Sequence, residues 1–383
     1  MDRRRRLAGL TVWRGRCDRP RKASALLKSS RPVFGTRAPR SARVGFTRFA
    51  PLHRRGRGSG IPAGEMMIDT VRTAGAPHPR PTVDKPLRAV APVMLETAGW
   101  EDYALLDSGH GRKLERYGRF RIVRPEEQAI WTPRYPAAEW DRADATFVGI
   151  GDDDSDGRWR YPRPVGETWP LSYDGIGFLG RFTAFRHVGV FPEQVAHWDW
   201  LRDRIAEARR PTKVLNLFAY TGVASLVAAK AGAEVVHIDA SKKAIGWARE
   251  NQDVAGMSGL PIRWICEDAV KFVEREQRRG NRYDGIILDP PKFGRGPKGE
   301  VWDIFTSLPA LLRACVTLLS TQPLFLILTA YSIRSSFMSI HELAAECLAE
   351  RGGLLESGEL VIRESGGGRG LSTSLFSRWS PDD

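Results

Sequence analysis

Apolar runs of strand length alternate with helical patterns in the second half of the chain, and this alternation is the feature that constrains its fold most. The strand-like runs are Val214–Phe218, Val235–Asp239, Ile262–Cys266, Gly285–Leu288 and Leu324–Leu328. The helical patterns are Ala224–Ala231, Lys242–Gln252, Ala269–Arg278, Phe305–Leu319 and Ser336–Arg351. Repeated βα units predict a parallel sheet covered by helices on both faces. Two later strand candidates, Gly358–Arg363 and Thr373–Trp379, predict a C-terminal β-hairpin.

A different pattern precedes this α/β region. Residues 95–190 contain short β-rich runs separated by Gly, Asp and Pro, which predict a small β-rich domain. Seven of the twelve tryptophans lie between Trp100 and Trp200. They fit either aromatic packing or stacking on flipped bases. From Pro192 apolar residues recur at helical spacing, so we place the larger α/β domain at residues 192–383.

Basic residues are concentrated at the start of the chain. The net charge is +14, but residues 1–60 hold 18 Lys and Arg against two Asp and Glu, and the remainder holds 41 against 43. Residues 1–85 lack apolar periodicity, and their composition predicts disorder. This tail has three interpretations: a nucleic-acid-binding arm, a transit peptide, or a translated upstream segment with Met66 or Met67 as the working start. We favour the third, because ordered sequence begins only after it.

The rest of the composition excludes several classes of protein. No apolar run approaches the ~20 residues that a membrane helix needs. The four cysteines form no CxxC pair and no even framework, so neither a metal site nor disulfides are predicted. A reducing cytoplasm is the simplest location. The sequence does not indicate an oligomeric state.

A turn with one glycine follows the first strand of the alternation. The turn Phe218–Gly222 leads into a helix N-terminus, which favours a carboxylate. Gly222 permits a positive φ or a close approach of the backbone to a ligand. A dinucleotide site normally shows G-x-G-x-x-G, so this loop suits the small zwitterion S-adenosylmethionine better than NAD. Considered alone, the glycine also fits an ordinary turn.

Acidic residues follow the next two strands. Asp239 lies 17 residues beyond Gly222, where its carboxylate can accept hydrogen bonds from both hydroxyls of a ribose. Asp268 is placed to accept one from an adenine amino group. For both residues the alternative is a helix N-cap.

The run Asp289-Pro290-Pro291-Lys292-Phe293 ends a later strand and is the most specific element of the sequence. Two prolines cannot continue a central strand, so they stiffen a turn. The carboxylate and a backbone carbonyl on that turn can accept hydrogen bonds from an amino group and orient its lone pair. We therefore predict that Asp289, Pro290 and Pro291 are catalytic. A structural turn is the alternative.

Phe218–Gly222, Asp239–Ser241, Arg249–Asn251 and Asp289–Phe293 together resemble the motifs of bacterial 23S rRNA large-subunit methyltransferases, which modify cytosine C5 and guanine N7. The resemblance covers about Leu95–Trp379. It implies a Rossmann-like, seven-stranded methyltransferase sheet with a C-terminal β-hairpin, S-adenosylmethionine as cofactor, and a substrate-recognition role for the small β-rich domain. It places the cofactor contacts at Phe218, Ala219, Tyr220, Thr221, Gly222, Asp239, Asp268 and Asp289.

Substrate contacts are also predicted. Gly189–Gln194 resembles the family's F-x-D-Q-R segment, with Val195 in place of the arginine. Asp107–Tyr117 resembles the small β domain of relatives known only as cofactor-dependent methyltransferases. We expect the substrate to contact Glu193, Gln194, Lys292, Phe293 and Tyr331.

One departure from the family bears on the reaction. Relatives that methylate cytosine C5 use a cysteine nucleophile after the fifth strand, but here that position reads Thr329–Ile333 without a cysteine. We therefore predict methylation of a base nitrogen in ribosomal RNA. The alternatives are an rRNA cytosine-C5 methyltransferase, a small-molecule or protein methyltransferase, and a non-catalytic cofactor- or RNA-binding protein.

Overall fold

The computed structural model describes residues 86–97, 99–149, 157–331, 333 and 335–382. The predicted disorder of residues 1–85 and the three interpretations of that tail lie outside these residues.

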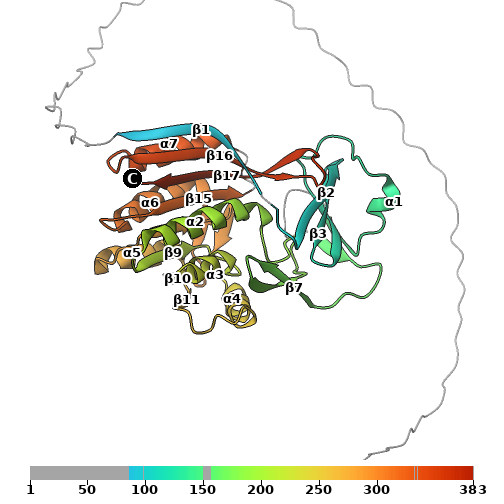
Figure 1. Cartoon of the computed structure of the whole chain (residues 1–383), viewed down its shortest axis with the longest axis horizontal. Helices are drawn as coiled ribbons and strands as arrows, with labels where there is room; N and C mark the ends of the chain where they lie inside the picture. The colour runs from blue at the N-terminus through green and yellow to red at the C-terminus, as the bar shows by residue number, and fades with distance from the viewer. Residues whose placement is uncertain (1–85, 98, 150–156, 332, 334, 383) are drawn as a thin grey trace, which may run out of the picture. The chain divides into compact units, whose positions relative to one another are not determined.

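Eight strands form the central sheet, in the order β1–β16–β17–β15–β12–β9–β10–β11 (Figure 1). They span Leu87–Glu96 (β1), Thr212–Leu217 (β9), Ala233–Asp239 (β10), Ile262–Cys266 (β11), Gly285–Leu288 (β12), Phe325–Tyr331 (β15), Gly353–Arg363 (β16) and Gly370–Ser380 (β17). The strands from β15 to β11 are all parallel, whereas β17 runs antiparallel to both β15 and β16. The protein therefore has a mixed α/β fold with the last two strands paired as a hairpin.

The strand β1 was not predicted. It pairs in parallel with β16 at the edge of the sheet, so the sheet has one strand more than the seven expected. Pro92 lies within β1, and an edge strand tolerates proline because one side of its backbone has no partner strand. The central sheet thus takes a strand from outside residues 192–383, the range predicted for the α/β domain.

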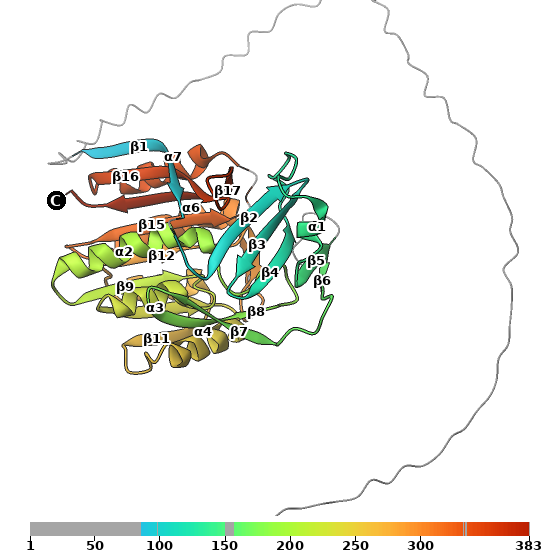
Figure 2. The same ribbon diagram turned by 45° about the vertical axis from the view of Figure 1, so that its right-hand side comes forward.

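Six helices cover the two faces of this sheet. One face carries α2 (Val195–Ala208), α3 (Val223–Lys230) and α4 (Lys242–Val254), and the other carries α5 (Ala269–Arg279), α6 (Ile304–Leu318) and α7 (Phe337–Leu348) (Figure 2). Neighbouring residues on a strand point to opposite faces. In β9, Val214 packs in the core under α2 and α3, while Leu215 packs in the core under α5 and α6. Burial on both faces explains why these strands read as continuous apolar runs.

A second sheet of five strands lies between β1 and α2 in the sequence. Its strands follow chain order: β2 (Tyr103–Gly109), β3 (Arg112–Tyr117), β4 (Phe120–Pro125), β5 (Ala145–Gly149) and β6 (Gly157–Arg160). A short helix, α1 (Ala137–Trp140), precedes β5, and the hairpin β7 (Thr168–Tyr173) and β8 (Ile176–Arg181) follows β6. This strand-rich region agrees with the β-rich pattern of the sequence.

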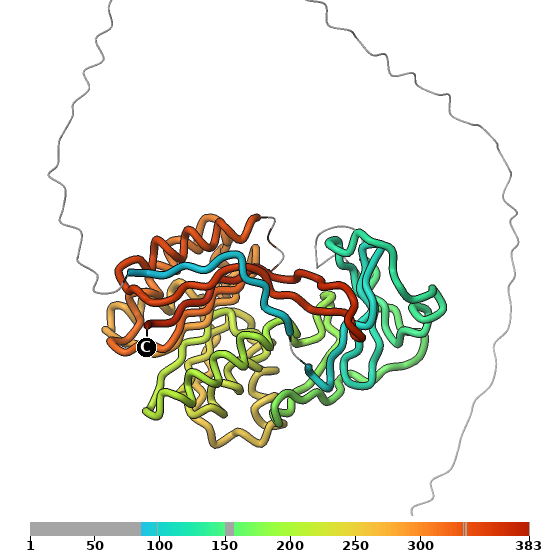
Figure 3. Tube along the Cα trace, turned by 45° about the horizontal axis from the view of Figure 1, so that its top comes forward, coloured from blue at the N-terminus to red at the C-terminus, as the bar shows by residue number. Residues whose placement is uncertain are grey.

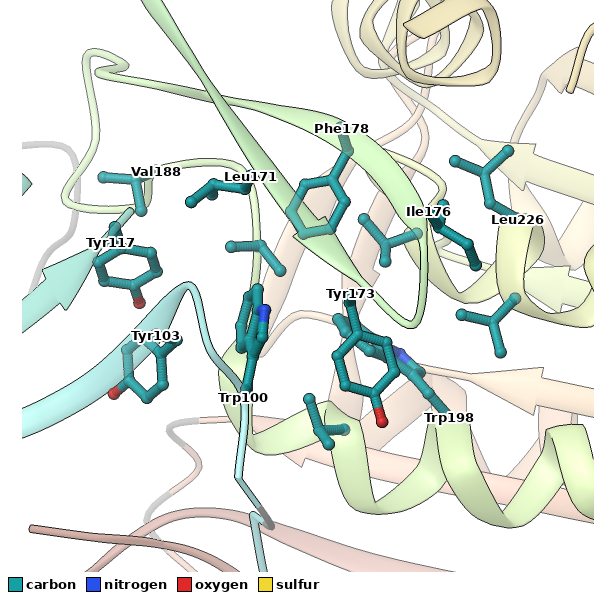
Figure 4. Close-up of a cluster of buried hydrophobic side chains, with 14 of the residues drawn as sticks. Trp100, Tyr103, Tyr117, Leu171, Tyr173, Ile176, Phe178, Val188, Trp198 and Leu226 are labelled. Atoms are coloured by element: carbon teal, nitrogen blue, oxygen red, sulfur yellow. The ribbon is translucent and has the colours of Figure 1, made fainter. Parts of the chain in front are cut away.

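Aromatic side chains pack where the β7–β8 hairpin meets α2. Figure 4 shows Trp100 facing Tyr173, Phe178 and Trp198. The ring centroids of Trp100 and Tyr173 are 5.9 Å apart, and those of Tyr173 and Trp198 are 5.3 Å apart. Five of the seven tryptophans between Trp100 and Trp200 are buried, four of them in one core against which the other two pack, and Trp140 in a smaller cluster. These rings therefore pack in the protein interior, which supports aromatic packing rather than stacking on flipped bases.

The turn between β16 and β17 contacts the five-stranded sheet. The backbone N–H of Ser365 donates to the carbonyl of Leu105 over 2.7 Å. The Ser108 hydroxyl donates to Oε1 of the buried Glu364 over 2.6 Å. Figure 3 shows the end of the β16–β17 pair beside the five-stranded sheet. This contact ties the two sheets together.

Across the described ranges, no helix has both the length and the apolarity needed to cross a membrane. The same residues contain no cluster of three or more His, Cys, Asp or Glu side chains arranged to hold a metal ion.

Candidate active site

A cavity of about 1200 Å³ opens at the carboxyl ends of β9, β10, β12 and β15. This is the edge at which open α/β sheets bind ligands. A smaller cavity of about 50 Å³ adjoins it. The two share the lining residues Phe191, Gln194, Phe218, Tyr220 and Asp289.

The loop after β9 has an unusual backbone conformation. Phe218 and Tyr220 have φ angles of 57° and 49°, and Gly222 has a φ angle of 84°. Positive φ is uncommon for bulky residues and is retained where surrounding structure enforces it, often at functional sites. A Cβ atom on Gly222 would lie 3.0 Å from side-chain atoms of Ala248 and Trp264, so both conformation and space require glycine. The expectation of a positive φ at Gly222 is confirmed.

Asp239 holds this loop from the end of β10. Its Oδ2 accepts a hydrogen bond from the Tyr220 backbone N–H over 2.8 Å, and its Oδ1 accepts one from the Ser241 N–H over 2.8 Å. Ser241, rather than Asp239, is the N-cap of α4. Burial raises the pKa of Asp239, and its two backbone hydrogen bonds oppose that rise. The carboxylate lies in the cavity lining, as a ribose-binding residue must.

Asp268 is the N-cap of α5, so the alternative role considered for it is present in the structure. Its Oδ1 accepts a hydrogen bond from the Lys271 backbone N–H over 3.0 Å. The residue also lines the large cavity, beside Glu267. A capping carboxylate can still accept a further hydrogen bond from a ligand.

Three of the predicted loop residues lie behind the large cavity. Ala219, Thr221 and Gly222 line only the smaller cavity, whereas Phe218 and Tyr220 line both. The hydroxyl of Thr221 is buried and donates to the carbonyl of Gly189 over 2.6 Å. Its side chain therefore anchors the loop to the segment that precedes α2.

Asp289 lies between the two cavities at the end of β12. The side-chain amide of Gln194 donates to its Oδ2 over 3.1 Å. Gln194 and Glu193 belong to the short helix η1 (Pro192–Gln194), and Glu193 is only 4% exposed. Burial and the nearby Glu193 carboxylate raise the pKa of Asp289 to about 7. Glu193, whose pKa is also raised by burial, accepts a hydrogen bond from the Ser374 hydroxyl over 3.3 Å.

The two prolines after Asp289 lead into a hairpin of β13 (Phe293–Arg295) and β14 (Val301–Asp303). The Pro291 carbonyl accepts a hydrogen bond from the indole N–H of Trp302 over 2.7 Å. Both prolines line the large cavity, as do Lys292 and Phe293. The stiff turn therefore forms part of the cavity wall.

Aromatic rings also line the large cavity. Phe191 lies 5.4 Å from Tyr331 and 5.8 Å from Tyr220, measured between ring centroids. His187 lies 4.8 Å from Phe191, and the guanidinium of Arg186 lies 5.8 Å from the centre of the Tyr331 ring. Tyr331 was predicted as a substrate contact, but Arg186, His187 and Phe191 were not. Their one signal in the sequence was proximity to Glu193 and Gln194.

The three cysteines in the described part of the chain do not line the cavity. Cys315 is buried in α6, Cys347 lies in α7, and the Cys266 thiol donates weakly to the Ala240 carbonyl. None of these three is among the residues that line either cavity. Burial raises the pKa of the thiols of Cys315 and Cys347, which disfavours the reactive thiolate.

The residues at this site fit S-adenosylmethionine. Asp239 and Asp268 present carboxylate acceptors at two neighbouring strand ends, suited to hydroxyl and amino donors. Ile238, Ala240 and Ala269 add apolar surface beside them, suited to a planar ring. The strained loop and the first residues of α3 line the smaller cavity.

Comparison with known proteins agrees with this geometry. A family model described as S-adenosylmethionine-dependent methyltransferase matches residues 121–333. The crystal structure of the SAM-dependent methyltransferase from Agrobacterium tumefaciens is 60% identical, with a TM-score of 0.75 over 78% of this chain and 96% of that chain. The crystal structure of SMU.776, provisionally assigned as a methyltransferase and complexed with SAH, is 17% identical with a TM-score of 0.57 over 73% and 75%. The second likeness concerns the fold alone.

Curated relatives match over shorter stretches. The ribosomal RNA large subunit methyltransferase K/L of Syntrophotalea carbinolica is 31% identical over 184 residues, which are 47% of this chain and 25% of that protein. The ribosomal RNA large subunit methyltransferase I of Aeromonas salmonicida is 37% identical over 93 residues, 24% of each chain. The chain thus spans about a quarter of the length of these curated relatives.

Proposed function

We propose, on the premise that this chain belongs to the S-adenosylmethionine-dependent methyltransferase family, that it methylates a nitrogen atom of a base in ribosomal RNA. The observation that carries the proposal is the position of Asp289, a partly buried carboxylate on a rigid turn, at the junction of the two cavities. The names of the curated relatives support ribosomal RNA as the substrate class.

In this proposal the cofactor is held by Asp239, Asp268 and the loop Phe218–Gly222. Bound S-adenosylmethionine would supply an electrophilic methyl group. Asp239 would accept hydrogen bonds from ribose hydroxyls, and Asp268 would accept one from the adenine amino group. Ala219, Thr221 and Gly222 line only the smaller cavity, so they would form the part of the loop that faces it, and Gly222 would let the backbone approach the ligand closely.

Asp289 would bind the substrate nitrogen. Its carboxylate can accept a hydrogen bond from an amino or ring N–H and so direct the nitrogen lone pair toward the methyl group. Gln194 already occupies one lone pair of Oδ2, which fixes the orientation of the carboxyl group. Phe191 and Tyr331 provide flat surfaces that a base can stack against.

Nitrogen is favoured over cytosine C5 as the methylated atom. Methylation at C5 requires a cysteine that attacks C6, and no described cysteine lines the cavity. Methylation of an amine needs orientation and removal of a proton, which Asp289 can assist.

The five-stranded sheet and its neighbours, residues 95–190, are proposed to recognise the substrate, and residues 192–383 are proposed to catalyse. The cavity takes lining residues from both parts, including Glu126 and Gln128 from the first. A ribosomal substrate also makes the cytoplasm the proposed location.

The test combines genetics with purified protein. Nucleosides from rRNA of a strain lacking the gene should lack one N-methylated base that is present in the wild type, as read by mass spectrometry. The purified chain with labelled S-adenosylmethionine should restore that mark, and Asp289→Ala should not. An adduct trapped on RNA containing 5-fluorocytosine would instead establish cytosine-C5 chemistry. Labelling of protein or small molecules alone would reject RNA as the substrate.

A further inference from the structure

The hairpin β13–β14 forms part of the rim of the large cavity and presents a second face outward. Residues pair as Phe293 with Asp303, Gly294 with Trp302, and Arg295 with Val301. Because side chains alternate across a strand, the buried Trp302 marks the inner face. Phe293, Arg295 and Val301 lie together on the outer face.

The hairpin is held by contacts on its inner face and at its turn. Trp302 donates to the Pro291 carbonyl and packs against Phe218, with ring centroids 4.8 Å apart. At the turn, the N–H of Gly296 donates to the Glu300 carbonyl over 2.8 Å, and Glu300 pairs with Lys271 of α5. A Cβ atom on Gly296 would lie 2.3 Å from Oε2 of Glu300, so a larger residue there would displace the Glu300 side chain. The outer face is therefore not needed to hold the hairpin.

That outer face combines exposed apolar side chains with cations. Phe293 is 63% exposed and Val301 is 74% exposed, and Phe305 in the first turn of α6 is 53% exposed. Lys292, Arg295 and Lys298 belong to the same hairpin, and within the described part of the chain none of them forms an ion pair. The acidic residues nearby are engaged: Glu300 pairs with Lys271, and Asp303 caps α6.

We propose that this outer face binds the single-stranded RNA that flanks the target nucleotide, with Phe293 stacked on a neighbouring base and Arg295 and Lys298 beside its phosphates. The proposal rests on the RNA substrate proposed above. Aromatic rings that stack on bases, next to cations that follow the backbone, are the common mode of single-strand binding. The face is continuous with the cavity, because Lys292 to Gly296 all line its rim. An apolar protein partner would leave Arg295 and Lys298 without a role, whereas Lys292 already lies over the Phe293 ring at 5.4 Å.

The experiment measures RNA binding by the full chain in the presence of saturating SAH. The probe is a short fluorescein-labelled single-stranded RNA of mixed sequence, followed by anisotropy at several salt concentrations. Phe293→Ala should weaken binding by about fivefold or more, the range of a lost base–aromatic stack. Arg295→Ala should also weaken binding and lower the slope of log affinity against log salt by about 1.

Matched controls lie elsewhere on the surface. Val254→Ala removes an exposed apolar side chain at the end of α4, and Arg282→Ala removes an exposed cation at the amino end of β12. Both should bind RNA as the wild type does. SAH affinity by calorimetry should be unchanged in all four variants, which shows that the cofactor site is intact.

A second readout separates this proposal from the proposed function. For the rRNA substrate, Phe293→Ala and Arg295→Ala should raise KM more than they lower kcat. Wild-type RNA affinity and wild-type KM in both hairpin variants would overturn the proposed RNA surface while leaving the methyltransferase assignment in place. Absence of any RNA methylation by the wild type would reject the proposed function. If these variants kept RNA binding but lost binding of a protein substrate, the outer face would bind protein, and the proposed RNA binding would be wrong.

Discussion

Asp289 is the residue on which the proposed chemistry depends, and its charge is set by its surroundings. A carboxyl group with a pKa of about 7 is half ionised near neutral pH. The ionised form only accepts hydrogen bonds, at both oxygens, whereas the protonated form carries an O–H donor on one of them. The nearby Glu193 carboxylate contributes to that pKa, since like charges disfavour ionisation.

Methyl transfer should therefore increase as pH rises through about 7. Glu193→Gln removes the neighbouring charge, so the pKa of Asp289 should fall and the rising limb of kcat/KM should move to lower pH. Glu234→Gln, at the start of β10 and outside the cavity lining, should leave the limb in place. The pH–rate profiles of the wild type and the two variants test this. If the rising limb of Glu193→Gln did not shift, the Glu193 charge would not be a cause of the raised pKa of Asp289.

Asp239 supports both the loop and the proposed ribose contact. Asp239→Ala should weaken S-adenosylmethionine binding by about 1.5–3 kcal/mol, the scale of hydrogen bonds to a charged group. Asp239→Asn keeps one acceptor oxygen and should lose less. Isothermal calorimetry measures both, and wild-type affinity in the alanine variant would remove Asp239 from the cofactor site.

At the scale of single elements, β3 and β4 carry charges into the interior. Arg124 donates to both oxygens of Glu115 over 2.7 Å, and both side chains are buried. The Glu115 carboxylate beside it raises the pKa of Arg124 well above its usual value, despite burial. Lys113 and Glu126 form a second buried pair at 3.0 Å.

Removing one partner of the buried Arg124–Glu115 pair should lower the free energy of unfolding more than removing both. Arg124→Met leaves the Glu115 carboxylate buried without its cation and should cost about 3–5 kcal/mol of unfolding free energy. The double variant Arg124→Met with Glu115→Leu should recover much of that loss, because neither member of this pair is then left buried without its partner. Urea denaturation monitored by circular dichroism measures the difference, and equal losses in the two variants would contradict it.

The same buried charges show what sequence could and could not predict. The strands β9, β10 and β12 were predicted because burial on both faces makes them continuous apolar runs. The segment of β3 was assigned to a β domain only through the resemblance of Asp107–Tyr117, since its sequence RKLERY reads as a solvated segment until the partners of Lys113 and Glu115 are known.

The candidate site divides in the same way. Phe218, Tyr220, Asp239 and Asp289 follow strand ends, and parallel strands bring their ends to one edge. The hydrogen bond from Gln194 to Asp289 joins residues 95 positions apart, and no local pattern predicts such a contact. The role of Asp268 could not be decided from the sequence, because a helix N-cap and a contact to the cofactor both call for an aspartate directly after the strand.

On the scale of the whole molecule, two buried histidines make stability depend on pH. Burial lowers the pKa of both His197 and His237 to about 3. In the unfolded chain a histidine has a pKa of about 6.5. The unfolded state therefore binds more protons below that value, so the stability present above about pH 6.5 is lost as pH falls toward 3.

His197→Leu should reduce this sensitivity. His197 makes no side-chain hydrogen bond within the described residues and packs against Phe376, so leucine keeps much of its contact. Between about pH 7 and about pH 5, the unfolding free energy of the variant should fall less than that of the wild type, by up to about 1.4 kcal/mol per pH unit. His110→Asn, at an exposed turn, is the control and should behave as the wild type. Chemical denaturation at several pH values measures this, and parallel losses in all three proteins would contradict it.

The strand order of the central sheet also has a consequence for synthesis on the ribosome. Chains are made from the N-terminus, and regions fold as their residues emerge. The strand β17 lies between β15 and β16, and β1 pairs only with β16. The five strands from β15 to β11 can therefore assemble on the growing chain, but β1 has no partner until residues 353–363 have emerged, and β16 joins the others only through residues 370–380. The earliest strand of the sheet must wait for nearly the whole of translation before it is paired.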